Sequence, residues 1–186
     1  MDHFTYFKYL RQRSRAGYFY RHYWLYPRLS RYLSGRTLDV GCGVGDLLRS
    51  RPETDGVDIN PMTVAWCKKQ GLPAHLMEPD VLPFHDASYD SVVLDNVLEH
   101  LLDPAPLLAE IRRVVKPRGK LLIGVPGCRG YAADSDHKVF YNEADLRRVL
   151  SVAGFDCLRV FAMPLPWRWL ESRISQYCLY GVFERN

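Results

Sequence analysis

The most informative segment of the chain is Thr37-Leu38-Asp39-Val40-Gly41-Cys42-Gly43-Val44-Gly45. Leu38 and Val40 are apolar residues that favour a β-strand, and three glycines with one residue between each follow them. Glycine suits a tight turn because it accepts a positive φ and has no Cβ to hold a ligand away. The pattern therefore predicts a buried strand, a glycine turn and a helix that begins near Asp46, with the backbone amides of the turn facing outward.

A second apolar run ends in an acid, Gly56-Val57-Asp58-Ile59-Asn60. A carboxylate at the tip of the neighbouring strand can accept two hydrogen bonds from a ribose diol. A nicotinamide-dinucleotide fingerprint would need glycine at position 46, where this chain has Asp46. Asp39 would repel a pyrophosphate, but it suits a ligand that carries an ammonium or a sulfonium. The two segments together predict a site for a nucleoside with a cationic group.

Three further motifs follow in order, namely Glu78-Pro79-Asp80-Val81-Leu82-Pro83-Phe84, Tyr89-Asp90-Ser91-Val92-Val93-Leu94-Asp95-Asn96-Val97-Leu98-Glu99-His100 and Val115-Lys116-Pro117-Arg118-Gly119-Lys120-Leu121-Leu122-Ile123. With the glycine turn, they resemble the class I, Rossmann-like S-adenosylmethionine-dependent methyltransferases over roughly residues 37–126, in particular the type-11-like branch that acts on small molecules and glycans. The resemblance implies an α/β fold with a doubly wound, seven-stranded sheet, mostly parallel with the last strand antiparallel. We expect one domain over residues 1–186, with a helical lid over 1–36 and the Rossmann-like core over 37–186.

The resemblance also implies roles for individual residues. Asp39 and the glycine turn would hold the methionine end of S-adenosylmethionine, and Asp58 would hold the ribose. Ile59 would pack on the adenine, whose amino edge Asp80 and the backbone of Val81 would read, although Asp80 could also only cap its loop. The residues expected to bind the cofactor are Asp39, Gly41, Cys42, Gly43, Gly45, Asp58, Ile59, Asp80, Val81 and Asn96.

Two histidines compete for the role of proton acceptor. His100 follows the fourth strand of the motif series, and His137 lies in a loop expected over the carboxyl ends of the strands, where open α/β sheets bind ligands. Imidazole titrates near neutrality, and Asp136 or another carboxylate could orient the ring of His137. Either histidine could instead be structural and bond to the backbone.

No metal or disulfide is expected. Methyl transfer from a sulfonium needs alignment and, for a hydroxyl acceptor, removal of a proton. No clustered His, Asp and Glu motif with ligand spacing is present. The five cysteines are scattered without a Cys-x-x-Cys pair, so reduced thiols are predicted.

The N-terminal segment differs from the rest of the chain. Residues 1–36 hold eight Lys or Arg against one acid, and 11 of the 24 aromatic residues. One or two helices split near Gly17 are predicted there. The aromatic residues could form core or lid, and the arginines could form a face that binds an anionic acceptor, a membrane surface or nucleic acid.

The remaining pattern predicts alternating strands and helices, including an abbreviated helix between Gly45 and Pro52 and a loop over 128–139. No apolar run reaches the roughly 20 residues of a membrane-spanning helix, and no secretory leader opens the chain. We therefore expect a cytoplasmic protein; its oligomeric state is left open.

The sequence predicts a metal-independent methyltransferase that acts on a hydroxyl or amine of a small molecule, sugar or lipid-linked glycan. Nucleic acid is disfavoured as the acceptor, because Asp95-Asn96-Val97-Leu98 lacks the two prolines and the aromatic residue of base-amino methyltransferases. Two alternatives remain open. One is an RNA or protein methyltransferase that uses the basic N-terminus, and the other is a non-catalytic S-adenosylmethionine-binding protein.

Overall fold

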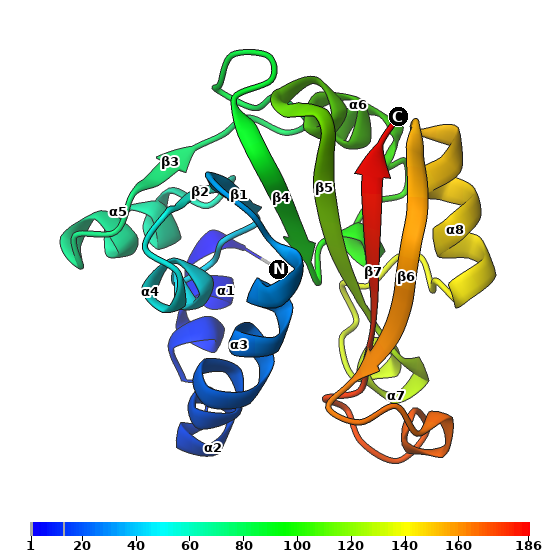
Figure 1. Ribbon diagram of the computed structural model, residues 1–186. Helices are drawn as coiled ribbons and strands as arrows, with labels where there is room; N and C mark the ends of the chain where they lie inside the picture. Colours follow the sequence, from blue (N-terminus) through cyan, green and yellow to red (C-terminus); the bar gives the residue numbers. More distant parts are fainter. Residues whose placement is uncertain (1, 13) are drawn as a thin grey trace.

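One mixed sheet runs through the protein (Figure 1). The computed structural model describes residues 2–12 and 14–186, without the side chain of Arg168. Met1 and Arg13, which belong to the predicted lid, lie outside the described residues. The strands of the described part are β1 (Thr37–Val40), β2 (Thr54–Asp58), β3 (Ala74–Leu76), β4 (Tyr89–Asp95), β5 (Val115–Pro126), β6 (Phe155–Met163) and β7 (Cys178–Arg185).

The strand order is β3-β2-β1-β4-β5-β7-β6. Strands β1 to β5 pair in parallel, and β7 runs antiparallel to both β5 and β6. This topology confirms the predicted doubly wound, seven-stranded sheet with an antiparallel last strand. The parallel strands end at one edge, which is the edge where the helices α2 (Arg15–Tyr20) and α7 (Cys128–Ala132) lie in Figure 1.

Helices surround the sheet. The other α-helices of the described part are α1 (His3–Arg11), α3 (Tyr26–Leu29), α4 (Asp46–Ser50), α5 (Pro61–Lys69), α6 (Ala105–Val114) and α8 (Glu143–Val152). A π-helix, η1 (Arg21–Leu25), and three 3-10 helices, η2 (Ser30–Tyr32), η3 (Leu98–His100) and η4 (Arg168–Leu170), complete the elements. No helix within residues 2–12 and 14–186 has both the length and the apolar character needed to span a membrane.

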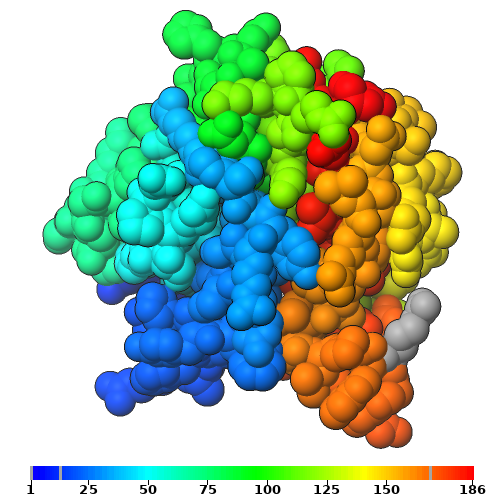
Figure 2. All heavy atoms as spheres, viewed as in Figure 1, coloured from blue at the N-terminus to red at the C-terminus, as the bar shows by residue number. Residues whose placement is uncertain are grey.

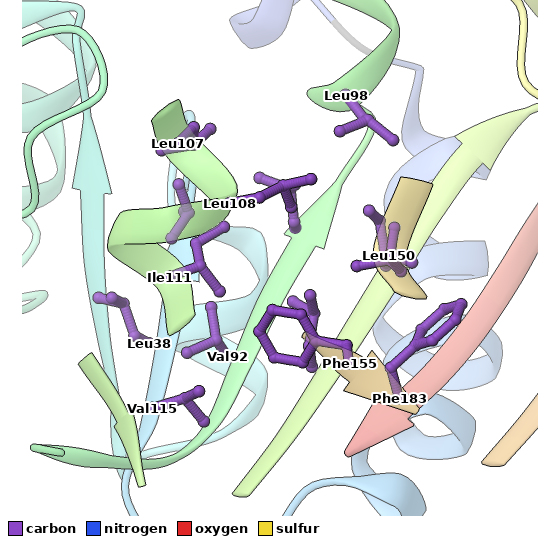
Figure 3. Close-up of a cluster of buried hydrophobic side chains, with 14 of the residues drawn as sticks. Leu38, Val92, Leu98, Leu107, Leu108, Ile111, Val115, Leu150, Phe155 and Phe183 are labelled. Carbon is purple, nitrogen blue, oxygen red and sulfur yellow. The ribbon is translucent and has the colours of Figure 1, made fainter. Parts of the chain in front are cut away.

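Alternating side chains of the central strands build two cores. Val92 of β4 faces α6 and α8, where it joins a buried cluster with Ile111 and Leu150 (Figure 3). Leu94 of the same strand belongs to this cluster. Val93 faces the opposite side of the sheet and joins a second cluster with residues of α3, α4 and β7. Both faces of β4 are therefore buried, which explains why its sequence is a continuous apolar run rather than an alternating one.

The abbreviated helix predicted between Gly45 and Pro52 is confirmed, whereas the loop predicted over 128–139 is wrong. Helix α4 has five residues, and α5 begins at Pro61, where the side chain of Asn60 accepts a hydrogen bond from the amide of Met62. The loop predicted over 128–139 instead contains α7. This helix has only five residues and no side-chain cap, so it carries no terminal signal in the sequence.

Two helices are present, and the break predicted near Gly17 lies before this residue, between α1 and α2. The chain leaves α1 at Gln12, and α2 starts after Ser14, whose hydroxyl accepts a hydrogen bond from the Gly17 amide at 3.1 Å. Gly17 therefore lies inside the first turn of α2. The serine cap provides enough stabilisation to start the helix there despite the low helix propensity of glycine.

The N-terminal helices are anchored by leucines more than by aromatic residues. Leu25, Leu29 and Leu33 are buried against the sheet in the second core. Only Tyr26 is buried among the N-terminal aromatic side chains of the described part, whereas six are exposed, namely Phe4, Tyr9, Tyr18, Phe19, Tyr23 and Trp24. Of the two expected roles, core or lid, the core therefore accounts for few of these aromatic residues.

Replacing Leu29, which is 1% exposed, with alanine should test whether the N-terminal helices share the core of the sheet. We expect the free energy of unfolding to fall by about 2–5 kcal/mol, because a cavity is left against the sheet. Urea unfolding followed by circular dichroism measures the change. Val152→Ala on α8, where the side chain is 86% exposed, is the matched control and should change stability by no more than about 0.5 kcal/mol. A Leu29→Ala variant as stable as the control would contradict this packing.

Candidate active site

The glycine turn after β1 has the backbone that the sequence predicts. Gly41, Gly43 and Gly45 have φ values of 77°, 53° and 80°. A Cβ at Gly41 would lie 2.5 Å from Cγ2 of Val97, so glycine is required there by both the conformation and the available space. The turn therefore brings the chain after β1 close to the segment that follows β4.

The expectation that the turn amides face outward is wrong for the four residues expected to bind the cofactor. The amides of Gly41 and Cys42 donate to the carbonyl of Val57 at 2.9 and 3.0 Å. The amide of Gly43 donates to Asp58 Oδ2 at 2.8 Å, and the amide of Gly45 donates to the carbonyl of Cys42. These donors fix the turn to β2 instead of forming an anion-binding nest. The side chain of Cys42 packs in a buried cluster.

Asp58 links three elements at the tip of β2. Its Oδ2 accepts from Gly43, and its Oδ1 accepts from the amide of Asn60 at 2.8 Å. The amide of the Asn60 side chain in turn donates to the carbonyl of His3 at 2.8 Å, which attaches α1 to the site. Each carboxylate oxygen keeps a further lone pair, so Asp58 can still accept from the hydroxyls of a ribose.

Buried carboxylates give this edge of the sheet a negative character. Burial raises the pKa of Asp39 well above its usual range, and the charges of Asp95 and Asp58 raise it further. Burial also raises the pKa of Asp58, although the hydrogen bonds from Asn60 and Gly43 oppose that change. Carboxylates in such surroundings favour a cationic partner. This site therefore suits a ligand with an ammonium or sulfonium, as the sequence predicts.

A cavity of about 660 Å³ lies at the carboxyl ends of β1, β4 and β5. Its walls include Asp39, Gly41, Cys42, Gly43 and Asn96, together with side chains from α1 and α2. The N-terminal helices therefore cover the cavity, in the place where a lid is predicted. In Figure 2 they occupy the same end of the molecule as the connector between β6 and β7, and the indole of Trp24 donates to the carbonyl of Pro164 in that connector at 3.3 Å.

The residues expected to contact the adenine lie outside the lining of this cavity. Ile59 and Val81 are apolar but 51% and 52% exposed, which leaves both side chains available for contacts. Asp80 has a left-handed backbone with φ of 58°, and the amide of Val81 donates to the carbonyl of Glu78 at 3.2 Å. An exposed apolar residue next to a left-handed aspartate is an arrangement that stability alone does not require.

Asn96 directly follows β4 and also has a left-handed backbone, with φ of 55°. Its side-chain amide donates to Asp95 Oδ1 at 2.9 Å, and its backbone amide donates to the carbonyl of Gly124. These bonds turn the chain at the floor of the cavity. Asn96 lines the same cavity as the glycine turn and the histidines described next.

His100 and His137 come together on one wall of the cavity, with ring centroids 4.7 Å apart. Nδ1 of His137 is 2.8 Å from the carbonyl of Tyr131, and Nδ1 of His100 is 3.3 Å from the carbonyl of Asp136. The expected orientation of His137 by the Asp136 carboxylate is therefore replaced by a backbone carbonyl. Because a carbonyl only accepts hydrogen bonds, both Nδ1 atoms carry a hydrogen.

Glu99 is the residue that the sequence analysis misses. It is fully buried beneath the two histidines, and burial raises its pKa to about 8. Neither carboxylate oxygen has a hydrogen-bond partner within the described residues, and Oε1 is 3.8 Å from Nε2 of His137. The sequence places Glu99 next to His100 but gives no sign that His137 lies beside it in the fold, because α6, β5 and α7 intervene.

Replacing Asp58 should test the ribose assignment. Asp58→Ala removes the charged acceptor, so we expect the affinity for S-adenosylmethionine to fall by about 1.5–3 kcal/mol. Asp58→Asn keeps one side-chain oxygen and should lose less. Calorimetric titration measures both variants, and circular dichroism checks that the turn still folds without the bonds to Gly43 and Asn60. Unchanged affinity in a folded Asp58→Ala variant would refute the assignment.

The comparisons with known proteins agree with this geometry. Residues 38–123 match the family model described as a methyltransferase domain. A probable S-adenosylmethionine-dependent methyltransferase of Mycolicibacterium smegmatis is 34% identical over 160 residues, which are 77% of this chain and 62% of that protein. A ubiquinone biosynthesis O-methyltransferase of Xanthomonas oryzae is 29% identical over 99 residues, which are 47% of this chain and 41% of that protein. The chain therefore spans less than two thirds of these relatives.

The fold has a counterpart among solved structures. A structure of an S-adenosylmethionine-dependent methyltransferase from Aquifex aeolicus has a TM-score of 0.72 and 20% identity, and covers 100% of both chains. That likeness supports the fold, whereas the matched domain and the relatives show similarity in sequence. Together they show a methyltransferase domain over residues 38–123, in a chain with the class I, Rossmann-like fold of S-adenosylmethionine-dependent methyltransferases.

Proposed function

We propose that this chain transfers the methyl group of S-adenosylmethionine to a hydroxyl of a small molecule, sugar or lipid-linked glycan. The observation that carries the proposal is the position of His100 and His137, which share one cavity with Asp39 and Gly41. An acceptor in that cavity has the methionine-binding turn on one side and imidazole nitrogens on the other. The O-methyltransferase among the relatives supports oxygen as the acceptor atom.

The chemistry requires little more than alignment and one proton acceptor. The bond between the methyl carbon and the sulfonium sulfur breaks as the bond to the acceptor oxygen forms, and S-adenosylhomocysteine leaves. The hydroxyl loses its proton in the same process. Nε2 of His137 is the proposed acceptor of that proton when no cation occupies the site, because the bond from Nδ1 to the carbonyl of Tyr131 leaves the lone pair on Nε2.

A second part of the proposal concerns where the acceptor comes from. Tyr18, Phe19, Tyr23 and Trp24 form an exposed aromatic surface on α2 and η1. Trp167 and Trp169 stack at 6.0 Å in the connector that Trp24 contacts, and both are exposed. Exposed aromatic residues combined with arginines are typical of proteins that lie on anionic membranes. We propose that this surface contacts an anionic lipid or acceptor close to the cavity.

His137→Ala should lower methyl turnover by about a hundredfold, because the transition state loses its proton acceptor. The affinity for S-adenosylmethionine should be nearly unchanged. His100→Ala should change cofactor affinity at least as much as turnover. The exposed His85 lies outside the cavity lining, so His85→Ala is the matched control and should change neither. Turnover unchanged in both site variants would instead indicate an amine acceptor that binds already deprotonated.

The membrane proposal predicts preferential binding to vesicles that contain phosphatidylglycerol over vesicles of pure phosphatidylcholine. Replacing the exposed Arg15 and Arg31 together with glutamine should weaken this binding by up to about 30-fold, since each arginine contributes about 1 kcal/mol near an anionic surface. Co-sedimentation at low salt measures the partition. Arg118 and Arg148 are exposed elsewhere, so the same double change there is the control and should have little effect. A parent protein that ignores both kinds of vesicle would contradict the proposal.

A further inference from the structure

The carboxyl group of Glu99 and the two histidine rings lie close to one another. One ligand atom from each of Glu99, His100 and His137 can be chosen so that all three lie within 4.8 Å of one another. With hydrogen on both Nδ1 atoms, each neutral ring presents the lone pair of Nε2. The side chains of His137 and Glu99 are 8% and 1% exposed, so water cannot readily satisfy them.

A protonated Glu99 would hold a donor with no acceptor in hydrogen-bond range, and an ionised Glu99 would be a buried carboxylate without a partner; both are costly. A single proton would have to bridge Nε2 of His137 and Oε1 of Glu99, but the 3.8 Å between these atoms is too long for a hydrogen bond. A cation can contact all three groups at once. Asp95 and Asp134 add negative charge near Glu99, which also favours a cation.

We propose that Glu99, His100 and His137 bind one divalent first-row transition-metal ion. Two imidazole nitrogens and one carboxylate suit Zn²⁺ or Mn²⁺, whereas Mg²⁺ prefers oxygen ligands. The bonds from the Nδ1 atoms to the carbonyls of Tyr131 and Asp136 are the outer contacts that orient histidine ligands in metal sites. The proposal departs from the metal-independent mechanism that the sequence predicts.

The backbone holds the three side chains in place before an ion arrives. The amides of Lys138 and Val139 both donate to the carbonyl of Glu99, at 2.7 and 3.1 Å. This pair of bonds fixes the segment that carries His137 to η3, which carries the other two groups. Ligands on one tetrahedral ion lie about 3.4 Å apart, since bond lengths to zinc are about 2.1 Å. The cluster therefore has to contract by about 1 Å or slightly more, which ring rotation and small loop shifts can provide.

An ion at this place would belong to the acceptor half of the cavity, because the two histidines line it and three protein ligands leave a coordination position open. This step rests on the proposed function. The acceptor hydroxyl would bind at the open position, where the cation lowers its pKa, so that its proton passes to water as the oxygen takes the methyl group. His137 is then a ligand, and the ion replaces it as the means of removing the proton.

The binding test uses the whole chain after chelator treatment and removal of the chelator. Calorimetric titration with ZnCl₂ or MnCl₂ should give one ion per chain, with MgCl₂ much weaker, and Co²⁺ should give absorption bands of a nitrogen-ligated ion. Glu99→Gln and His137→Gln should each weaken binding by at least about tenfold, as loss of a ligand does at least as much as loss of an outer contact. His85→Gln should bind as the parent does.

Thermal unfolding distinguishes a ligand from a structural residue. Glu99→Gln replaces a buried carboxyl group that has no hydrogen-bond partner within the described residues, so the metal-free variant should melt no lower than the metal-free parent. The parent should gain thermal stability with Zn²⁺, and the variant should lose most of that gain. An ion that binds the parent and both site variants equally, or no binding at all, would overturn the proposal.

Turnover and cofactor binding separate this proposal from the proposed function. With the ion as a participant, metal-free protein should bind S-adenosylmethionine normally but turn over poorly until Zn²⁺ or Mn²⁺ is restored. Full turnover in the presence of chelator would overturn the catalytic role of the ion and leave the methyltransferase proposal standing with His137 as base. Site-specific metal binding without methyl turnover on any hydroxyl acceptor would support the metal site and count against the proposed function.

Discussion

Carboxylates buried at the carboxyl edge of the sheet are the constraint on which the rest of the site depends. Asp39, Asp58 and Glu99 are each at most 6% exposed. A charged group in such surroundings needs donors or a cation, and the protein provides donors for only some of them. Asp58 receives two backbone amides, whereas Glu99 receives none within the described residues. The fold therefore retains part of its negative charge for ligands to neutralise.

The N-terminal segment helps to cover one face of the sheet. Helix α4 is only five residues long, and α3 and η1 pack beside it on the same face of the sheet. Leu25 and Leu29 fill space there, next to Leu47 of α4. The short helix is therefore compensated within the chain itself. The exposed aromatic residues on the outer side of α2 and η1 are not needed for this packing, which makes them available for contacts with another molecule.

The sequence was sufficient for the sheet because its signals are local. The spaced glycines, the aspartate after β2 and the apolar run of β4 each determine a turn or strand through backbone sterics and burial. The sequence was less informative where contacts between residues far apart in the chain determine the local structure. The Ser14 cap moved the N-terminal break, and the direction of the turn amides depended on Val57 and Asp58. The cluster of Glu99 with His137 depends on the path of the chain after β5. The spacing of residues along the sequence does not predict that path.

The bond between Asn60 and His3 has a consequence for how the N-terminus and the nucleoside half of the site communicate. The backbone of Asn60 donates to Asp58, and its side chain holds the start of α1. Thermodynamic coupling between two sites is reciprocal. Any ligand of Asp58 that binds more tightly when α1 is docked must hold α1 in place by the same free energy. For such a ligand, binding at Asp58 and docking of α1 are coupled through Asn60. The docked fraction of α1 then rises when the ligand binds.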